Sequence, residues 1–211
     1  MSGLSVPFMD LRPGEESAAI LDAIARVMGR GWFVLGPEVE AFEQEFAAAA
    51  GAPYAVGVGN GTDAIALILR GLGVGPGDEV ITTPLSAAFT ALAIMMAGAR
   101  PVFAVIDSER MTLDPASAER AITARTAALL PVHLYGQPAD MASLAALAER
   151  KGLALVEDCC QAHLATSGGR PVGTFGAAGA FSFYPTKISA RSAMAARSSR
   201  VTRRSRRASH V

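Results

Sequence analysis

The sequence predicts an α/β protein with a mostly parallel sheet that carries helices on both faces. From about residue 54 onward, short apolar segments alternate with longer segments of helical period. The short segments are apolar at nearly every position, which is typical of strands buried on both faces of a parallel sheet. Hydrophobic residues make up 51% of the 211 positions and charged residues 18%, so the chain can bury a sizeable core.

Two helices are expected before the first strand. The first spans residues 15–28, where one helical stripe is formed by Ile20, Leu21, Ile24, Val27 and Met28 and is ended by Gly29 and Gly31. The second is expected to begin at Pro37 and to end before Gly51. Strands are expected at 54–58, 79–83, 101–105, 127–132, 153–157 and 179–184, with helices between them at 62–71, 86–97, 115–123 and 140–151.

Charge is distributed unevenly along the chain. The formal net charge is zero, yet residues 188–211 contain seven arginines and six serines, no acidic residue and no hydrophobic period. Residues 1–187 therefore carry 12 basic and 19 acidic side chains, a net charge of about −7. A tail of this composition buries too little apolar surface to order itself, and we expect it to be disordered. Nucleic-acid binding is the alternative, but no aromatic residue is interleaved to stack on bases, so we expect no nucleic-acid partner.

The chain shows no targeting or membrane signal. No apolar segment approaches the ~18 residues of a membrane span, and the N-terminus has no basic region followed by an apolar one. The two cysteines, Cys159 and Cys160, are adjacent and have no distant partner, so a structural disulfide is not expected. These features predict a cytoplasmic protein without a membrane partner.

Polar residues and glycines follow the expected strands at 59–63, 83–84, 133–137, 157–163 and 182–187. In α/β sheets, ligands bind at this carboxyl edge of the strands. The segment at 59–62 joins a strand to a helix, so the amides of Gly61 and Thr62 and the Thr62 hydroxyl could hold a phosphate. A glycine turn without a ligand is the alternative, because the spacing fits neither the dinucleotide-binding fingerprint nor the Walker loop.

Asp158 and Lys187 are the candidate catalytic residues. Asp158 ends an apolar strand, where a carboxylate needs a partner such as a protonated pyridine nitrogen; a helix N-cap or a paired structural acid is the alternative. Lys187 and Lys151 are the only lysines. Lys151 lies at a helix end that favours an exposed cation, whereas Lys187 lies at the same sheet edge as Asp158. If a lysine performs covalent chemistry it is Lys187; a surface loop lysine is the alternative.

With these residues assembled, the sequence resembles the DegT/DnrJ/EryC1/StrS family of sugar aminotransferases that use pyridoxal 5'-phosphate (PLP). The similarity covers roughly residues 5–187. It lies in VPFMDL at 6–11, GPEVEAFEQEFA at 36–47, GNGTDAIALIL at 59–69, PVHLYGQPADM at 131–141, VEDCCQAH at 156–163 and GAFSFYPTK at 179–187. The last two motifs, at this separation, are the most specific.

The resemblance implies the large domain of the fold-type-I aminotransferases, here residues 1–187 and incomplete. Lys187 would hold PLP as a Schiff base and act as general acid and base, and Asp158 would pair with the pyridine nitrogen. Gln161 would face the 3-oxygen of the cofactor, and Ser182 with residues 61–62 would hold its phosphate. The family transfers an amino group, usually from glutamate, to a keto group of a nucleotide-linked sugar, and it works as a homodimer. No metal is implied.

The chain departs from the family in two places. Many relatives stack an aromatic residue or a histidine on the cofactor ring, where this chain has Ala87; Phe89 either substitutes for it or belongs to the core. After Lys187, relatives continue with a segment such as NLGALGDGGAVV and a small C-terminal domain. One base deleted from GC-rich codons for that segment gives Ile-Ser-Ala-Arg-Ser-Ala-Met-Ala-Ala-Arg-Ser, which is residues 188–198. We therefore expect residues 188–211 to be an out-of-frame tail and this product to be inactive.

Two other functions stay open at the level of sequence. One is a non-catalytic PLP-binding or regulatory relative of the same fold, against which the presence of Asp158 and Lys187 counts. The other is a short-chain dinucleotide-binding oxidoreductase. The missing glycine fingerprint and the lysine after the last strand argue against the oxidoreductase.

Overall fold

The computed structural model describes residues 17–184, Lys187 and residues 196–199. The VPFMDL motif and most of the arginine-rich tail lie outside these residues. The helices are α1 (Ser17–Arg30), α2 (Pro37–Ala49), α3 (Gly61–Gly71), α4 (Phe89–Met96), α5 (Pro115–Arg120), the 3-10 helix η2 (Leu134–Gly136) and α6 (Met141–Lys151). The strands are β1 (Ala55–Val58), β2 (Glu79–Thr82), β3 (Arg100–Phe103), β4 (Thr126–Leu129), β5 (Ala154–Asp158), β6 (Thr166–Ser167), β7 (Arg170–Pro171), β8 (Ala178–Ser182) and β9 (Ala196–Ser199).

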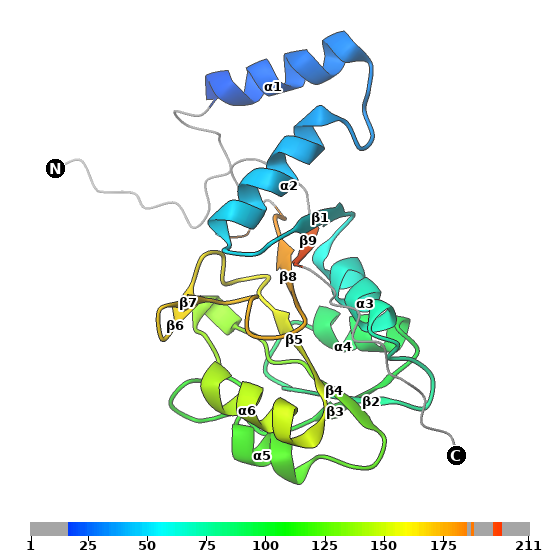
Figure 1. The fold of residues 1–211 in the computed structure, drawn as a ribbon, viewed down its shortest axis with the longest axis vertical. Helices are drawn as coiled ribbons and strands as arrows, with labels where there is room; N and C mark the ends of the chain where they lie inside the picture. Colours follow the sequence, from blue (N-terminus) through cyan, green and yellow to red (C-terminus); the bar gives the residue numbers. More distant parts are fainter. Residues whose placement is uncertain (1–16, 185–186, 188–195, 200–211) are drawn as a thin grey trace, which may run out of the picture.

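Seven strands form one sheet in the order β1-β9-β8-β5-β4-β2-β3 (Figure 1). The strands from β3 through β2, β4 and β5 to β8 are parallel to their neighbours, whereas β9 is antiparallel to both β1 and β8. Strands β6 and β7 form a separate antiparallel hairpin. The expected α/β class with a mostly parallel sheet is therefore confirmed.

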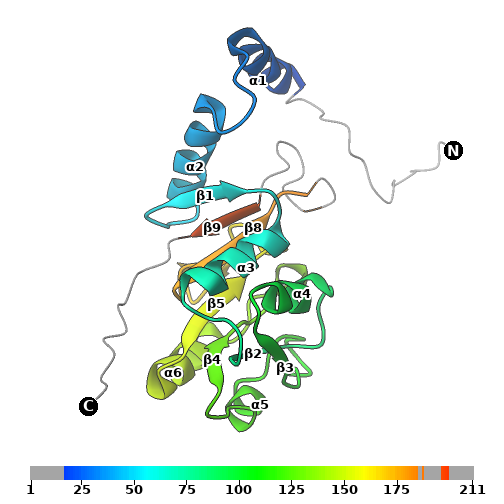
Figure 2. The ribbon, with the colours of Figure 1, turned by 90° about the vertical axis from the view of Figure 1, so that its right-hand side faces the viewer.

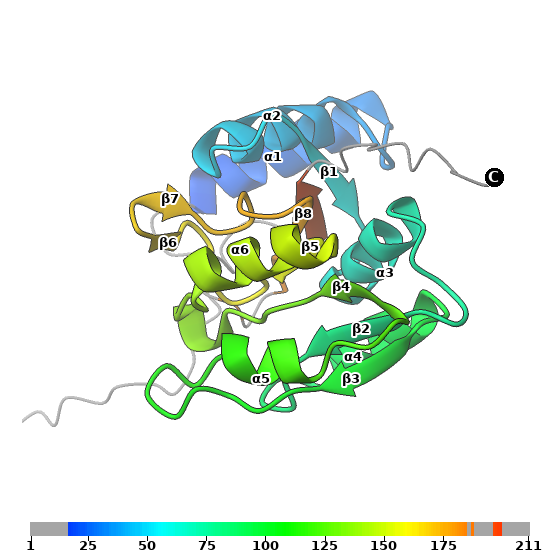
Figure 3. The ribbon, with the colours of Figure 1, turned by 60° about the horizontal axis from the view of Figure 1, so that its bottom comes forward.

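The inner parallel strands β2, β4, β5 and β8 are almost entirely buried, and their successive side chains point to opposite faces of the sheet. Val80 and Val156 pack with α3 and α4, whereas their neighbours Ile81 and Leu155 pack with α5 and α6. The two helix pairs accordingly lie on opposite sides of the strands (Figure 2 and Figure 3). This arrangement explains why the strand segments are apolar throughout. No helix in the described part of the chain is long and apolar enough to cross a bilayer.

Helix α2 is attached to the sheet by aromatic side chains. Phe46 meets Phe181 and Phe183 with ring centroids 5.0 Å apart in both pairs, and Phe42 meets Phe183 at 5.2 Å. All three contacts have the edge-to-face geometry that aromatic pairs prefer. These contacts bring α2, which contains the GPEVEAFEQEFA motif, onto the end of β8, the strand that precedes Lys187.

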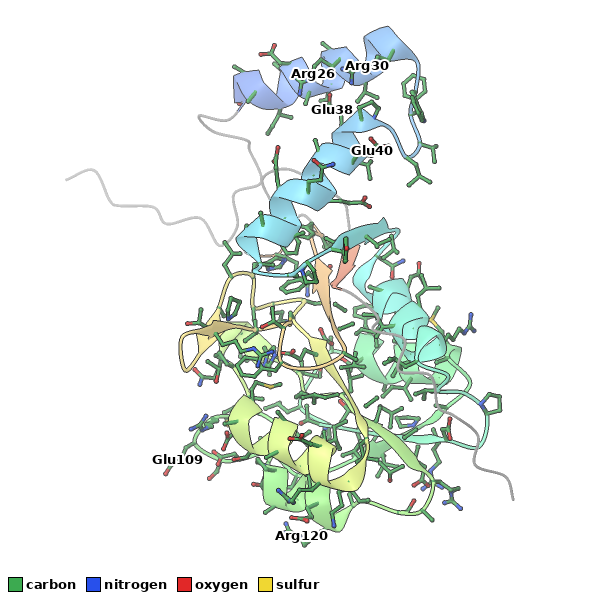
Figure 4. The ribbon with its side chains drawn as sticks, viewed as in Figure 1. Arg26, Arg30, Glu38, Glu40, Glu109 and Arg120 are labelled. Carbon is green, nitrogen blue, oxygen red and sulfur yellow. The ribbon has the colours of Figure 1, made fainter. Side chains whose placement is uncertain are left out.

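Helix α1 lies outside this core. It has no buried residue, and it extends away from the sheet beyond α2. Two ion pairs connect it to α2: Arg26 and Arg30 of α1 lie 2.8 Å and 3.2 Å from the carboxylate of Glu38 in α2 (Figure 4). Because these side chains are exposed, the pairs contribute little to stability.

Each helix and strand expected from the sequence is present, with ends that differ by no more than about three residues where they are described. Three features were missed: the 3-10 helix η2, the β6–β7 hairpin and strand β9. The β6–β7 hairpin turns at Gly168 and Gly169, both with positive φ, which the two-residue hairpin turn requires. Strand β9 lies within the segment expected to be disordered. Its backbone pairs with β1 and β8, so it joins the sheet through hydrogen bonds rather than through an apolar pattern.

Candidate functional site

The candidate residues gather at one edge of the sheet. Asp158 is the last residue of β5, Ser182 is the last of β8, and Gly61 and Thr62 begin α3. Because β5 and β8 are parallel neighbours, their carboxyl ends lie side by side. Gly61, Asp158 and Ser182 are buried, and Thr62 is half-buried. The sheet topology thus creates the edge at which α/β proteins bind ligands.

The start of α3 lies directly against the ends of β5 and β8. A Cβ atom on Gly61 would lie 2.7 Å from Cys160 Sγ and 3.1 Å from Ser182 Cβ, so a side chain at this position has no room. Asn60 caps the helix by accepting the N–H of Asp63 at 2.9 Å. The remaining amides of a first helical turn lack partners within the helix, and the helix dipole favours an anion there. The geometry therefore suits a phosphate between α3 and Ser182.

Asp158 is a buried carboxylate with a donor on each oxygen. The Thr90 hydroxyl donates to Oδ2 at 2.8 Å, and the Cys160 N–H donates to Oδ1 at 3.1 Å. Thr90 Oγ1 lies 3.0 Å from Ser86 Oγ, which extends the chain of hydroxyls from α4 into the loop that precedes it. Among the residues that the structure describes, Asp158 forms no ion pair. Neither an N-cap nor a cation of the described chain therefore accounts for its burial.

Gln161 is fixed by a turn on the neighbouring strand connection. Its side-chain oxygen accepts the N–H of Tyr135 at 2.9 Å. Tyr135 and Gly136 have φ values of 55° and 84°, so two residues in left-handed conformations direct this N–H toward Gln161. Because the oxygen is occupied, the amide NH₂ of Gln161 remains available to donate to an acceptor such as a phenolic oxygen.

Lys187 lies near the same edge. Its side chain is half-buried, and its backbone N–H donates to the carbonyl of Tyr184 at 2.8 Å. The Lys187 charge acts on two neighbours. Burial raises the pKa of the Cys160 thiol well above its ordinary value, and Lys187 opposes this rise. Burial also lowers the pKa of His163, and Lys187 lowers it further. Lys187 is thus within electrostatic range of Cys160 and His163, two residues of the connection that follows β5.

Phe89 is the first residue of α4 and its side chain is 63% exposed. The interpretation of Phe89 as a core residue is therefore wrong, because α4 begins at Phe89 rather than at 86 and turns Thr90 inward instead. Thr90 is the site residue that the sequence analysis missed. A threonine in the first turn of a helix after a Thr-Thr-Pro loop gave no signal by itself, since its role depends on the helix register against Asp158.

The match to known proteins decides the family. The model of the DegT/DnrJ/EryC1/StrS aminotransferase family matches residues 15–192. The chain belongs to this family. Of the motifs expected from the sequence, those at 59–69, 131–141, 156–163 and 179–187 contribute to the edge described above, whereas GPEVEAFEQEFA at 36–47 forms α2.

Two of the matches come from Streptomyces venezuelae. A dTDP-3-amino-3,4,6-trideoxy-alpha-D-glucose transaminase is 53% identical over 184 residues, which is 86% of this chain and 48% of that protein. The crystal structure of DesV in complex with a ketimine intermediate superposes with a TM-score of 0.86 at 47% identity, covering 93% of this chain and 53% of that one.

A second similar structure, ntda from Bacillus subtilis with bound cofactor pmp, has a TM-score of 0.84 at 30% identity, covering 94% of this chain and 45% of that one. The large-domain fold of the PLP aminotransferases is thereby confirmed. The chain spans about half the length of the relatives that it matches.

Proposed function

We propose that this sequence encodes the cofactor-binding half of a PLP-dependent aminotransferase that acts on a nucleotide-linked keto-sugar. Glutamate is the proposed amino donor, and the working form is a cytoplasmic homodimer. Support comes from the similar dTDP-sugar transaminase and from the bound forms of the two similar structures. The observation that carries the proposal is the convergence of Asp158, Ser182 and the start of α3 at one sheet edge.

The residues present fit PLP in charge and in shape. A phosphate would meet the amides of Gly61 and Thr62 together with Ser182. Because Gly61 has no side chain, the start of α3 can lie close to Ser182. Asp158 forms no ion pair with a described residue, and its buried carboxylate could pair with a protonated ring nitrogen. Gln161 offers the 3-oxygen its NH₂ group, for which no partner is found among the described residues.

When bound, PLP supplies an electron sink for the carbanion chemistry of transamination. Lys187 Nζ would attach the cofactor covalently and then move a proton as general acid and base. The Asp158 carboxylate, held by Thr90 and Cys160, would keep the ring nitrogen protonated. Exposed Phe89, on the turn next to Thr90, is the proposed residue that covers the ring.

We further propose that residues 1–187 form the large-domain part and that residues 188–211 are a tail without a function of their own. The amino-donor and sugar contacts of a complete enzyme would then come from chain beyond the described residues and from a second subunit. On this proposal, the 211-residue product binds PLP weakly and does not transaminate. Sequencing the gene around codon 187 tests the frame, and a continuous frame with no displaced downstream coding sequence would contradict the tail assignment.

The covalent test uses the purified 211-residue chain. We expect borohydride reduction in the presence of PLP to attach the cofactor to Lys187, as identified by peptide mass. Lys187→Ala should abolish the adduct, whereas Lys151→Ala serves as the matched control and should leave it unchanged. Asp158→Asn should keep the adduct but weaken cofactor binding. An adduct on Lys151, or none on the chain at all, would contradict the proposed function.

A further inference from the structure

Two completely buried polar residues, Glu157 and His133, lie next to Asp158 of the candidate site. Glu157 precedes Asp158 in β5, and His133 is bonded to Asp158 through the backbone. We propose that they form a positioning pair that holds Asp158 and Gln161 in a fixed relative geometry for the cofactor. The proposal rests on the proposed function, since it assigns these residues to the same site. Neither side chain is expected to touch the cofactor or the substrate.

The Glu157 carboxylate is fully occupied by donors. Oε1 accepts the N–H groups of Phe175 at 2.7 Å and Gly176 at 3.1 Å, and Oε2 accepts the N–H of Gly173 at 2.8 Å. His133 Nε2 lies 3.2 Å from the same Oε2. Four donors match the capacity of a carboxylate, so its burial without a metal or a strong base is explained. Glu157 thereby ties the turn before β8 to β5.

The tautomer of His133 follows from its two partners. Nδ1 accepts the N–H of Ala139 at 3.1 Å, so the ring proton lies on Nε2 and is donated to Glu157. Both ring nitrogens are therefore used, and the ring can neither rotate nor change tautomer without losing a buried hydrogen bond. Losing one such bond would leave a buried donor or acceptor without a partner, which is destabilising.

The same residue connects this pair to the two cofactor-facing groups. The backbone N–H of His133 donates to the backbone carbonyl of Asp158 at 3.0 Å. This bond ties the end of β5 to the segment that follows β4. The His133 ring also holds the far end of the turn that contains Tyr135, whose N–H fixes Gln161 at 2.9 Å. A shift of the ring would therefore move Asp158 and Gln161 relative to each other.

A metal site is the competing interpretation of these side chains. Ligand atoms of His133, Glu157 and Cys159 all lie within 4.8 Å of one another. However, the imidazole nitrogens and the carboxylate oxygens already have hydrogen-bond partners. Burial raises the pKa of Cys159 well above its ordinary value, which disfavours the thiolate that a metal would bind. The geometry thus favours positioning over coordination.

The test compares two buried glutamates in the full 211-residue chain. Glu157→Gln keeps the shape but places an NH₂ group against the donors of Gly173 or His133. Glu79→Gln is the matched control, because Glu79 is only 2% exposed yet begins β2 at the opposite end of the parallel strands. Amide hydrogen exchange is measured for peptides covering 133–141 and 158–163.

We expect exchange in both peptides to accelerate about tenfold in Glu157→Gln and to stay unchanged in Glu79→Gln, as the loss of one buried hydrogen bond requires. Equal rates in wild type and Glu157→Gln, or equal acceleration in both variants, would overturn the positioning role. So would stoichiometric zinc binding that is lost in Glu157→Gln. If Glu157→Gln does not fold, His133→Asn replaces it, since Asn can accept the Ala139 N–H but cannot reach Glu157.

PLP titration separates this inference from the proposed function. We expect Glu157→Gln to bind PLP about tenfold more weakly than wild type, with Glu79→Gln within a factor of about two. If the wild-type chain forms no adduct at Lys187, the proposed function is refuted. The amide hydrogen exchange would still decide whether Glu157 and His133 position Asp158 and Gln161. Equal PLP affinity in wild type and Glu157→Gln would refute the inference alone.

Discussion

The close approach of Gly61 to Cys160 predicts how the cofactor edge tolerates a single methyl group. In Gly61→Ala, the new Cβ would lie 2.7 Å from Cys160 Sγ, about 1 Å inside the usual non-bonded separation of ~3.5–4.0 Å. Helix α3 cannot easily retreat, because most of its residues are buried in the core. Overpacking of this kind costs about 1–3 kcal/mol, which exceeds the small helical preference for alanine at a first-turn position.

A double-mutant cycle isolates the contact. Cys160→Ala removes the sulfur that the new methyl group would meet, so Gly61→Ala should be less harmful in that background by about 1 kcal/mol. The rescue should be incomplete, because the 3.1 Å approach to Ser182 Cβ remains. Gly29→Ala in α1 is the control: nothing lies within 4 Å of its Cβ, so it should be neutral or slightly stabilising.

The assay is urea or thermal unfolding of all four variants of the cycle and of Gly29→Ala. For a chain of this size, 1 kcal/mol corresponds to about 2–4 °C in Tm. Unfolding free energies of Gly61→Ala and wild type that agree within about 0.5 kcal/mol would refute the reasoning. So would an equal penalty for Gly61→Ala with and without Cys160, because the clash would then lie elsewhere.

Three further variants test separate interactions. Thr90→Val removes a buried donor to Asp158 and should weaken PLP binding about tenfold in a titration; unchanged affinity would show that the hydroxyl does not hold the carboxylate. The Thr123 hydroxyl, with a neighbouring arginine, keeps the pKa of Glu79 below its ordinary 4.5, so stability should fall with pH below that value and Glu79→Gln should lack this component. Identical acid unfolding of wild type and Glu79→Gln, followed by circular dichroism, would contradict this role of Glu79. Burial lowers the pKa of His163 from 6.5, so the unfolded chain takes up the proton first and stability should decline as pH falls below 6.5; His163→Phe should flatten that slope in urea titrations, and a persistent slope would exclude His163 as its source.

The sequence predicted the inner strands well because both faces of β2, β4, β5 and β8 are buried. Pairs such as Val80 and Ile81, or Leu155 and Val156, are apolar at consecutive positions, and each member fills a different core layer. It also indicated that Asp158 and Lys187 lie at one edge, since parallel strands bring their carboxyl ends together. The chemical roles of these residues came from the family resemblance and remain predictions.

What the sequence could not predict depends on register and on backbone pairing. The inward position of Thr90 follows from where α4 begins, three residues later than expected. The 2.7 Å that would separate a Cβ on Gly61 from Cys160 Sγ follows from the position of α3 on the strand ends. Strand β9 has no strand-like apolar alternation, and it pairs because β1 and β8 both offer a free edge. The Gly168-Gly169 turn was visible as a hairpin signal and was overlooked.

The three buried acidic residues of the described chain that matter here are compensated in different ways. Glu79 is neutralised by Arg125 at 2.7 Å and also accepts a hydrogen bond from Thr123. Glu157 has four hydrogen-bond donors and no capacity left. Among the described residues, Asp158 has two N–H or O–H donors and forms no ion pair, although it is only 6% exposed. A carboxylate left in this state is costly to bury unless a positive charge completes it. Of the three acids, Asp158 is also the one at the cofactor edge, so a protonated ring nitrogen meets both the missing charge and the position.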